Sequence, residues 1–240
     1  MQVYISNREI EEIAEGLVRT VYGQNLPKQI DLGLLSKYLG VTVLYEKIAE
    51  DDLDKIGFVS DGCTPLMVCQ KGVKCKIIYP KDTVVLDIFL LRPEEYHRKR
   101  FTEGHEIGHI LLNRADPMRN AACFNRVYDT ERSYSITELH DRMSLDENQA
   151  NAMAACLLMP RALLTDSVKR HFRRKTIPVY GNCVFLPQVK PILQKMSKEI
   201  GVSHTALFIQ LRKYGLLEQR NMSEYFQKTG RNGEISDEYR

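Results

Sequence analysis

The sequence has no apolar stretch long enough to cross a membrane. Its longest apolar segments, residues 84–91 and 153–159, fall well short of the roughly 20 residues that a membrane-spanning helix requires, and Asp87 interrupts the first. The N-terminal residues also lack the basic segment followed by an apolar one that marks a secretory signal. We therefore expect a protein without a membrane span, located in the cytoplasm.

Neither charge sign dominates the chain. The 240 residues include 34 Lys and Arg against 31 Asp and Glu, which leaves a formal net charge of +3. This balance gives no indication of nucleic-acid binding, which usually accompanies an excess of positive charge. One basic run, residues 169–175, stands out. It is most simply a solvated helix face or loop, and a patch for an acidic partner is the alternative.

Cysteine pairs with the spacing of a zinc knuckle are also missing. None of the six cysteines belongs to a Cys-x-x-Cys pair, and the chain is too long for a small secreted protein held together by disulfides. The even spacing of Cys63, Cys69 and Cys75 is interpreted as unrelated thiols in or near strands, with a redox or metal role as the alternative. Hydrophobic residues make up 43% of the chain, which excludes a fully disordered protein.

Periodic apolar positions predict an α+β fold. Two helices, over residues 8–22 and 32–39, precede a small antiparallel sheet. The segments with β pattern are 41–45, 56–60, 65–69, 75–79 and 84–91. A long helix starts after Pro93, and the C-terminal half is mainly helical. The expected helices there are 94–113, 144–160, 161–173, 188–200 and 203–214. We expect residues 1–230 to form a single domain and residues 231–240 a flexible tail.

Residues 105–109, His-Glu-Ile-Gly-His, lie inside the expected long helix. Positions four apart share one face of a helix, so His105 and His109 can bind one zinc ion. Zinc lowers the pKa of its bound water towards about 7, and Glu106, beside the first ligand, can take the proton of that zinc-bound water. The motif therefore predicts one catalytic zinc ion, with Glu106 as the general base.

A hydrolytic zinc site needs a third protein ligand and an open position. Motifs with a third His six residues after the second are excluded, because the chain has Ala115 there, preceded by Leu112 where those motifs have Gly. A carboxylate from a later helix is then expected. The candidates are Glu131, Glu138, Asp141, Asp146 and Glu147.

Glu147 is the favoured candidate because short side chains follow it on one helical face. These residues are Ala150, Asn151 and Ala154. Gly104 and Gly108 form a matching stripe on the first helix, so the two helices can pack closely and bring Glu147 to the zinc. The alternative is a capping box of Ser144 and Glu147, which would turn Glu147 back to the backbone. Asn151, one helical turn after Glu147, can form a hydrogen bond to one of the metal-binding side chains. The alternative is that its amide only packs between helices.

Together the two motifs resemble the ImmA/IrrE-type metallo-endopeptidase family, whose zinc sites are gluzincin-like. Residues 101–112 (FTEGHEIGHILL) and 147–160 (ENQANAMAACLLMP) follow the two helix motifs of the family in the same order. The resemblance extends from about residue 32 to about residue 217, and Met153 stands where an aromatic residue is frequent. It implies that the zinc ligands are His105, His109 and Glu147 and that Glu106 is the base. It also implies a cytoplasmic regulatory protease that cuts helix-turn-helix repressors of mobile elements or stress responses.

A second feature lies within residues 188–217. Its part 196–217 resembles a helix-turn-helix, with a helix end at Gly201 and a helix cap at Ser203. DNA binding is one interpretation, although the exposed positions of the second helix supply little positive charge. The others are an αα-corner packed on the peptidase and a docking surface for the repressor substrate.

The leading prediction is a zinc-dependent endopeptidase that cleaves an intracellular protein. The alternative is a DNA-binding or repressor-binding regulator with a non-catalytic metal site. Glu106 separates the two, because a purely structural metal site needs no base beside its first ligand. The sequence leaves the group that stabilises the oxyanion open, and His140, Tyr134 and Tyr180 are the candidates.

Overall fold

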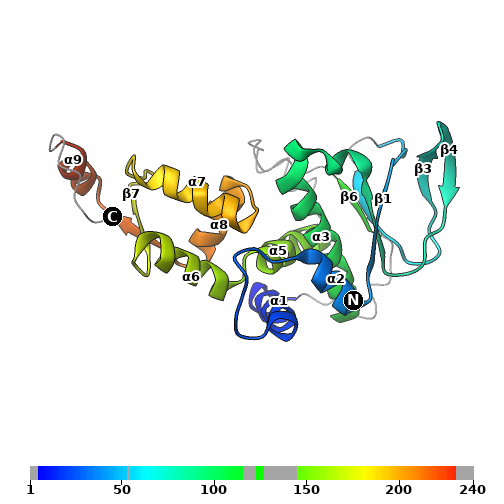
Figure 1. Cartoon of the computed structure of the whole chain (residues 1–240), viewed down its shortest axis with the longest axis horizontal. Coiled ribbons are helices and arrows are strands. Elements are labelled where there is room, and N and C mark those ends of the chain that lie inside the picture. Colours follow the sequence, from blue (N-terminus) through cyan, green and yellow to red (C-terminus); the bar gives the residue numbers. More distant parts are fainter. Residues whose placement is uncertain (1–4, 53–54, 116–122, 127–144, 231–240) are drawn as a thin grey trace.

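The structure is a computed structural model that describes residues 5–52, 55–115, 123–126 and 145–230 (Figure 1). It has the α+β architecture expected from the sequence, with strands in the N-terminal half and a mainly helical C-terminal half. No helix among the described residues is long and apolar enough to span a membrane. The expected flexible tail, residues 231–240, lies outside the described residues.

Helix α1 (Asn7–Tyr22) begins at a capping box and packs through one apolar stripe. The Ser6 hydroxyl accepts a hydrogen bond from the Glu9 backbone N–H (3.3 Å), and the Glu9 carboxylate accepts one from the Ser6 N–H (2.7 Å). The stripe consists of the buried residues Ile10, Ala14, Leu17 and Val18. Helix α2 (Leu32–Leu39) ends at Gly40, whose φ of 68° lies in the left-handed region that favours glycine.

The main sheet has the strand order β1-β5-β2-β6. Its strands are β1 (Thr42–Glu46), β2 (Lys55–Val59), β5 (Thr83–Asp87) and β6 (Cys123–Arg126). β2 runs antiparallel to both neighbours, whereas β1 runs parallel to β5. The sheet is therefore mixed rather than wholly antiparallel. The segments between β1 and β5 reverse the chain direction, so that β5 runs the same way as β1.

Strands β3 (Leu66–Gln70) and β4 (Val73–Ile77) form a separate antiparallel hairpin. Its two-residue turn consists of Lys71 and Gly72, both with positive φ, as a type I′ turn requires. The expected strand over 84–91 is shorter than the apolar pattern suggests. Asp87 ends it by accepting a hydrogen bond from the Phe89 N–H (2.9 Å), which starts the 3-10 turn η1 (Ile88–Leu91).

Helix α3 (Tyr96–Ala115) runs through the middle of the fold, after the short turn η2 (Pro93–Glu95). On one side, Ile110 packs on the main sheet with Ile56 and Leu86. On the other, Ile107 and Leu112 belong to a larger core made with α1 and α5 (Leu145–Leu158). Because apolar neighbours surround α3 on both sides, the polar side chains in its central part, residues 102–109, are held away from bulk water.

The C-terminal helices extend from the α3–α5 pair on the side opposite the sheet (Figure 1). They are α6 (Arg161–Phe172), α7 (Val189–Ile200), α8 (His204–Lys213) and α9 (Met222–Gly230), with the parallel pair β7 (Ile177–Tyr180) and β8 (Leu217–Arg220). The buried core that contains α1 and α5 continues without a break into α8. The buried Arg100 adds a polar link, because it donates to the backbone carbonyls of Ile30 (2.8 Å) and Gly201 (3.0 Å).

Candidate metal centre

Two imidazoles of α3 and one carboxylate of α5 converge on a single point. One potential ligand atom from each of His105, His109 and Glu147 lies within 4.8 Å of the other two. The Nε2 atoms of the two histidines are 2.9 Å apart, and they lie 3.2 Å (His105) and 3.4 Å (His109) from the carboxylate oxygens of Glu147. These are the three residues that the sequence predicts as ligands, and helix α5 brings Glu147 to the histidines as the small-residue argument requires.

Close packing of α3 against α5 makes this approach feasible. A Cβ atom added at Gly104 would lie 3.5 Å from the Cβ of Ala154, and one added at Gly108 would lie 3.0 Å from the carbonyl oxygen of Ala150. Larger residues on the two stripes would separate the helices. The expected small-residue interface is therefore confirmed, and it places the first turn of α5 beside the histidines.

The electrostatic environment keeps Glu147 ionised. Burial alone would raise its pKa, but the hydrogen bonds to His105 and His109 outweigh burial and hold the pKa of Glu147 well below its usual range. Burial lowers the pKa of His109, whereas for His105 the hydrogen bond to Glu147 and the charge of Glu106 overcome burial and raise the pKa. An ionised carboxylate and two imidazole nitrogens together form a site that attracts a cation.

Asn151 orients the first histidine. Its side-chain oxygen Oδ1 lies 2.8 Å from Nδ1 of His105, so the expected hydrogen bond between Asn151 and a ligand is present. An amide oxygen only accepts hydrogen bonds, so Nδ1 carries a proton, and Nε2 is the ring nitrogen that faces His109 and Glu147. The His105 ring is thereby held in the orientation in which Nε2 can bind a metal.

Glu106 is fully buried where α3 meets strand β2. A Cβ atom added at Gly57 of β2 would lie 3.0 Å from Cδ of Glu106 and 3.2 Å from Cγ2 of Thr102. A side chain at position 57 would therefore collide with the Glu106 carboxylate in its present position. Gly57 is the residue that the sequence analysis missed, and its signal was a glycine inside the strand KIGFV, which often marks a close approach.

Other candidates do not join this cluster. Tyr180 lies in β7, where every residue is buried, and its ring packs edge-on against Tyr225 of α9 with centroids 5.6 Å apart. Because β7 and α3 lie far apart along the long axis of the molecule, the structure does not bring Tyr180 to the site (Figure 1). Asp146 is described but supplies no ligand atom to the cluster. The candidates Glu131, Tyr134, Glu138, His140 and Asp141 lie outside the described residues.

The class of site is defined by its composition: an HExxH helix and a glutamate from a second helix that lies beside both histidines. Residues 36–203 match the family described as the IrrE N-terminal-like domain, Peptidase_M78. The match covers more than two thirds of the chain, which therefore belongs to this family and is related to zinc metallopeptidases. The comparison with curated proteins finds no match.

Proposed function

We propose that this protein is a zinc-dependent endopeptidase. The observation that carries the proposal is the cluster of two imidazole nitrogens and one carboxylate, with the buried Glu106 beside the first of them. Family membership supports the same class of activity. We further propose that the chain acts in the cytoplasm and that residues 1–230 work as one domain.

The residues present fit a catalytic zinc ion. Two histidines and one glutamate are a ligand set that zinc hydrolases use, and it leaves a coordination position open. Asn151 orients His105 so that its Nε2 faces the cluster, and Glu147 is ionised. A zinc ion held by His105, His109 and Glu147 would supply Lewis acidity, which activates water and polarises the carbonyl of the scissile peptide.

The chain itself moves the protons. Glu106 accepts a proton from the attacking water as its oxygen forms a bond to the peptide carbonyl carbon. The same carboxyl group then donates this proton to the leaving nitrogen as the C–N bond breaks. The products are a carboxylic acid and an amine, and proton exchange between them gives a carboxylate and an ammonium group. Gly57 supports both transfers, because any larger side chain at this position would displace the Glu106 carboxylate.

The proposed substrate is an intracellular protein, and within that class a helix-turn-helix repressor of a mobile element or stress response. The resemblance to the ImmA/IrrE-type peptidases supports this choice. The oxyanion-stabilising group is proposed to come from His140 or Tyr134, since the described residues around Tyr180 belong to another part of the fold.

Replacement of Glu106 by Gln tests the proposal. The variant keeps its shape and the three ligands, so we expect wild-type zinc content by elemental analysis. Without a group that takes up the proton, cleavage should fall by about 10²–10⁴-fold. The assay follows a helix-turn-helix protein encoded beside this gene, with product masses read by mass spectrometry. Asp146→Asn is the control, because it removes a nearby charge that supplies no ligand atom.

The result also separates the enzyme from a regulator with a non-catalytic metal site. If Glu106→Gln retains its zinc and leaves both cleavage and the cellular response unchanged, the endopeptidase proposal is wrong. The regulator then becomes the better explanation. If the variant retains zinc and captures an intact partner protein, that partner is the substrate.

A further inference from the structure

Positive charge is concentrated in the C-terminal helices. Residues 161–230 contain 13 Lys and Arg against four Asp and Glu, whereas residues 1–160 contain 19 against 24. Residues 161–230 thus carry a net charge of +9 and residues 1–160 a net charge of −5, and the remaining −1 of residues 231–240 brings the total to +3. Such asymmetry between two parts of one chain indicates an anionic partner for the basic part.

The few acidic residues in this part are already neutralised. The Glu199 carboxylate forms ion pairs with three side chains. Its Oε2 atom lies 3.2 Å from a nitrogen of His171, 3.8 Å from one of Arg170 and 3.9 Å from that of Lys28. The other three, Asp166, Glu218 and Glu224, each lie within 4.0 Å of a Lys or Arg nitrogen. Several cations have no ion pair with a described residue, and all of them are exposed. They are Arg173, Lys175, Lys190, Lys195, Lys198, Arg212 and Lys213.

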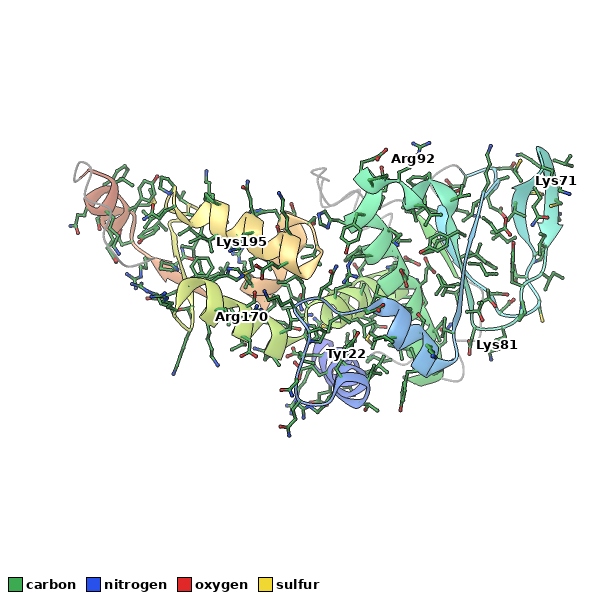
Figure 2. All side chains as sticks on the ribbon, in the orientation of Figure 1. Tyr22, Lys71, Lys81, Arg92, Arg170 and Lys195 are labelled. Carbon is green, nitrogen blue, oxygen red and sulfur yellow. The ribbon has the colours of Figure 1, made fainter. Side chains whose placement is uncertain are left out.

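Two of these cations, Lys195 and Lys198, lie close to the ion pairs that Glu199 makes with Arg170 and Lys28. The pair between Arg170 of α6 and Glu199 of α7 brings the ends of those helices together. Lys195 lies four residues before Glu199 on α7, and Lys198 lies three residues after Lys195, so Lys195 has both residues as neighbours on the helix surface. Figure 2 shows Arg170 and Lys195 on these neighbouring helices. We define the basic cluster as Lys28, Arg170, Lys195 and Lys198.

Helices α7 and α8 have the local geometry of a helix-turn-helix next to this cluster. The turn of residues 201–203 contains Gly201 with φ 77°, and the Ser203 hydroxyl caps α8 by accepting from the Ala206 N–H (3.1 Å). One face of α8 is buried, and the other is open and carries no acidic residue. The open face consists of His204, Thr205, Ile209, Arg212 and Lys213. A helix of this kind can lie in the major groove while its flanking cations contact phosphates.

We propose that α7, α8 and the basic cluster bind double-stranded DNA through its phosphate backbone. Duplex DNA presents one negative charge per roughly 1.7 Å of its axis, and this extended row of charges matches exposed cations spread over α7 and α8 better than an isolated acidic patch would. The small net charge of the whole chain gave no indication of DNA binding. The excess of positive charge in residues 161–230 favours it. The proposal does not depend on the metal centre, which lies on α3 and α5.

Fluorescence anisotropy with the full chain and a labelled DNA duplex of arbitrary sequence, about two helical turns long, tests this surface. Neutralisation of about four phosphates predicts that affinity falls on the order of a hundredfold between about 50 and 200 mM salt. The double variant Lys195→Gln with Lys198→Gln should weaken binding and reduce the slope of log affinity against log salt by about two.

The matched control is Lys74→Gln with Lys76→Gln. These exposed lysines lie on β4, in the hairpin whose turn carries Lys71 at the far end of the molecule (Figure 2). The control removes the same charge and should leave binding and salt slope unchanged. Absence of binding at low salt, equal losses in the two double variants, or tighter binding to poly-glutamate than to DNA would each overturn the proposal. The last outcome would indicate an acidic protein partner instead. Unchanged thermal unfolding of both variants excludes misfolding as the cause.

Discussion

A single methyl group at Gly108 tests whether helix α5 sets the position of Glu147. In Gly108→Ala the new Cβ would lie 3.0 Å from the Ala150 carbonyl oxygen and 3.2 Å from Cβ of Met153. Both distances are too short for ordinary contacts, so α5 must move away by a few tenths of an ångström. Ala150 lies within one helical turn of Glu147. The movement therefore withdraws the carboxylate, while His105 and His109 stay together on α3.

The expected loss is larger for the metal than for the fold. Overpacking costs about 1–3 kcal/mol, and replacement of glycine by alanine inside a helix offsets about 1 kcal/mol of this. The free energy of unfolding of the metal-free protein should thus fall by about 0–2 kcal/mol. Metal–ligand distances tolerate deviations of only about 0.2 Å, similar to the displacement itself. We expect zinc affinity to fall about tenfold to a hundredfold, equivalent to about 1.4–2.8 kcal/mol.

Gly104→Ala provides the matched control on the same helix. Its Cβ would lie 3.5 Å from the Cβ of Ala154, an ordinary contact, so zinc affinity should stay unchanged and the metal-free protein should melt slightly higher. The assay is a zinc titration against a chromophoric chelator, together with thermal unfolding of both metal-free variants. Wild-type zinc affinity in Gly108→Ala, or equal losses in both variants, would refute the reasoning.

Two further predictions concern stability. Arg100→Met leaves two buried backbone carbonyls without their donor and should lower the free energy of unfolding by about 2–4 kcal/mol in a urea titration, whereas the neighbouring Arg98→Met should have little effect. Backbone hydrogen bonds from Thr64 and Cys63 lower the pKa of Asp61 to about 2 from its ordinary 3.8. Its stabilising contribution is therefore fully present above pH 3.8 and lost as the pH falls towards 2. The stability difference between wild type and Asp61→Asn should shrink over that interval, and a constant difference would contradict the assignment.

The ligand set could be predicted from the sequence because its determinants are local. His105 and His109 share a face by helical periodicity, and the short residues that follow Glu147 fix which side of α5 can approach α3. Non-local features were less accessible. The close approach of Gly57 to Glu106 depends on the placement of β2 over α3, and the parallel pairing of β1 with β5 depends on a crossover that no local pattern encodes.

Two other differences have a related origin. Tyr180 was a candidate because of its chemistry alone, yet its place was decided by the β7–β8 pairing with a strand about 40 residues later in the chain. The charge of the chain looked balanced because the acidic residues of the peptidase part cancel the basic residues of the C-terminal helices. Individual pairs such as Arg161 with Glu11 (2.6 Å) join the two parts, but the C-terminal helices as a whole keep their excess of positive charge.

Charge balance within α3 explains why a cation belongs at this site. His105, Glu106 and His109 are each at most 2% exposed, although polar side chains on a helix normally face water. Glu147 adds a second carboxylate, ionised and next to the same histidines. A fully buried Glu106 and a half-buried, ionised Glu147 beside two imidazoles are unfavourable unless positive charge compensates them. One divalent cation among His105, His109 and Glu147 would balance both carboxylates. Removal of the metal should therefore destabilise the fold around α3 and α5 more than it destabilises the C-terminal helices, and site-resolved hydrogen exchange with and without zinc would measure this difference.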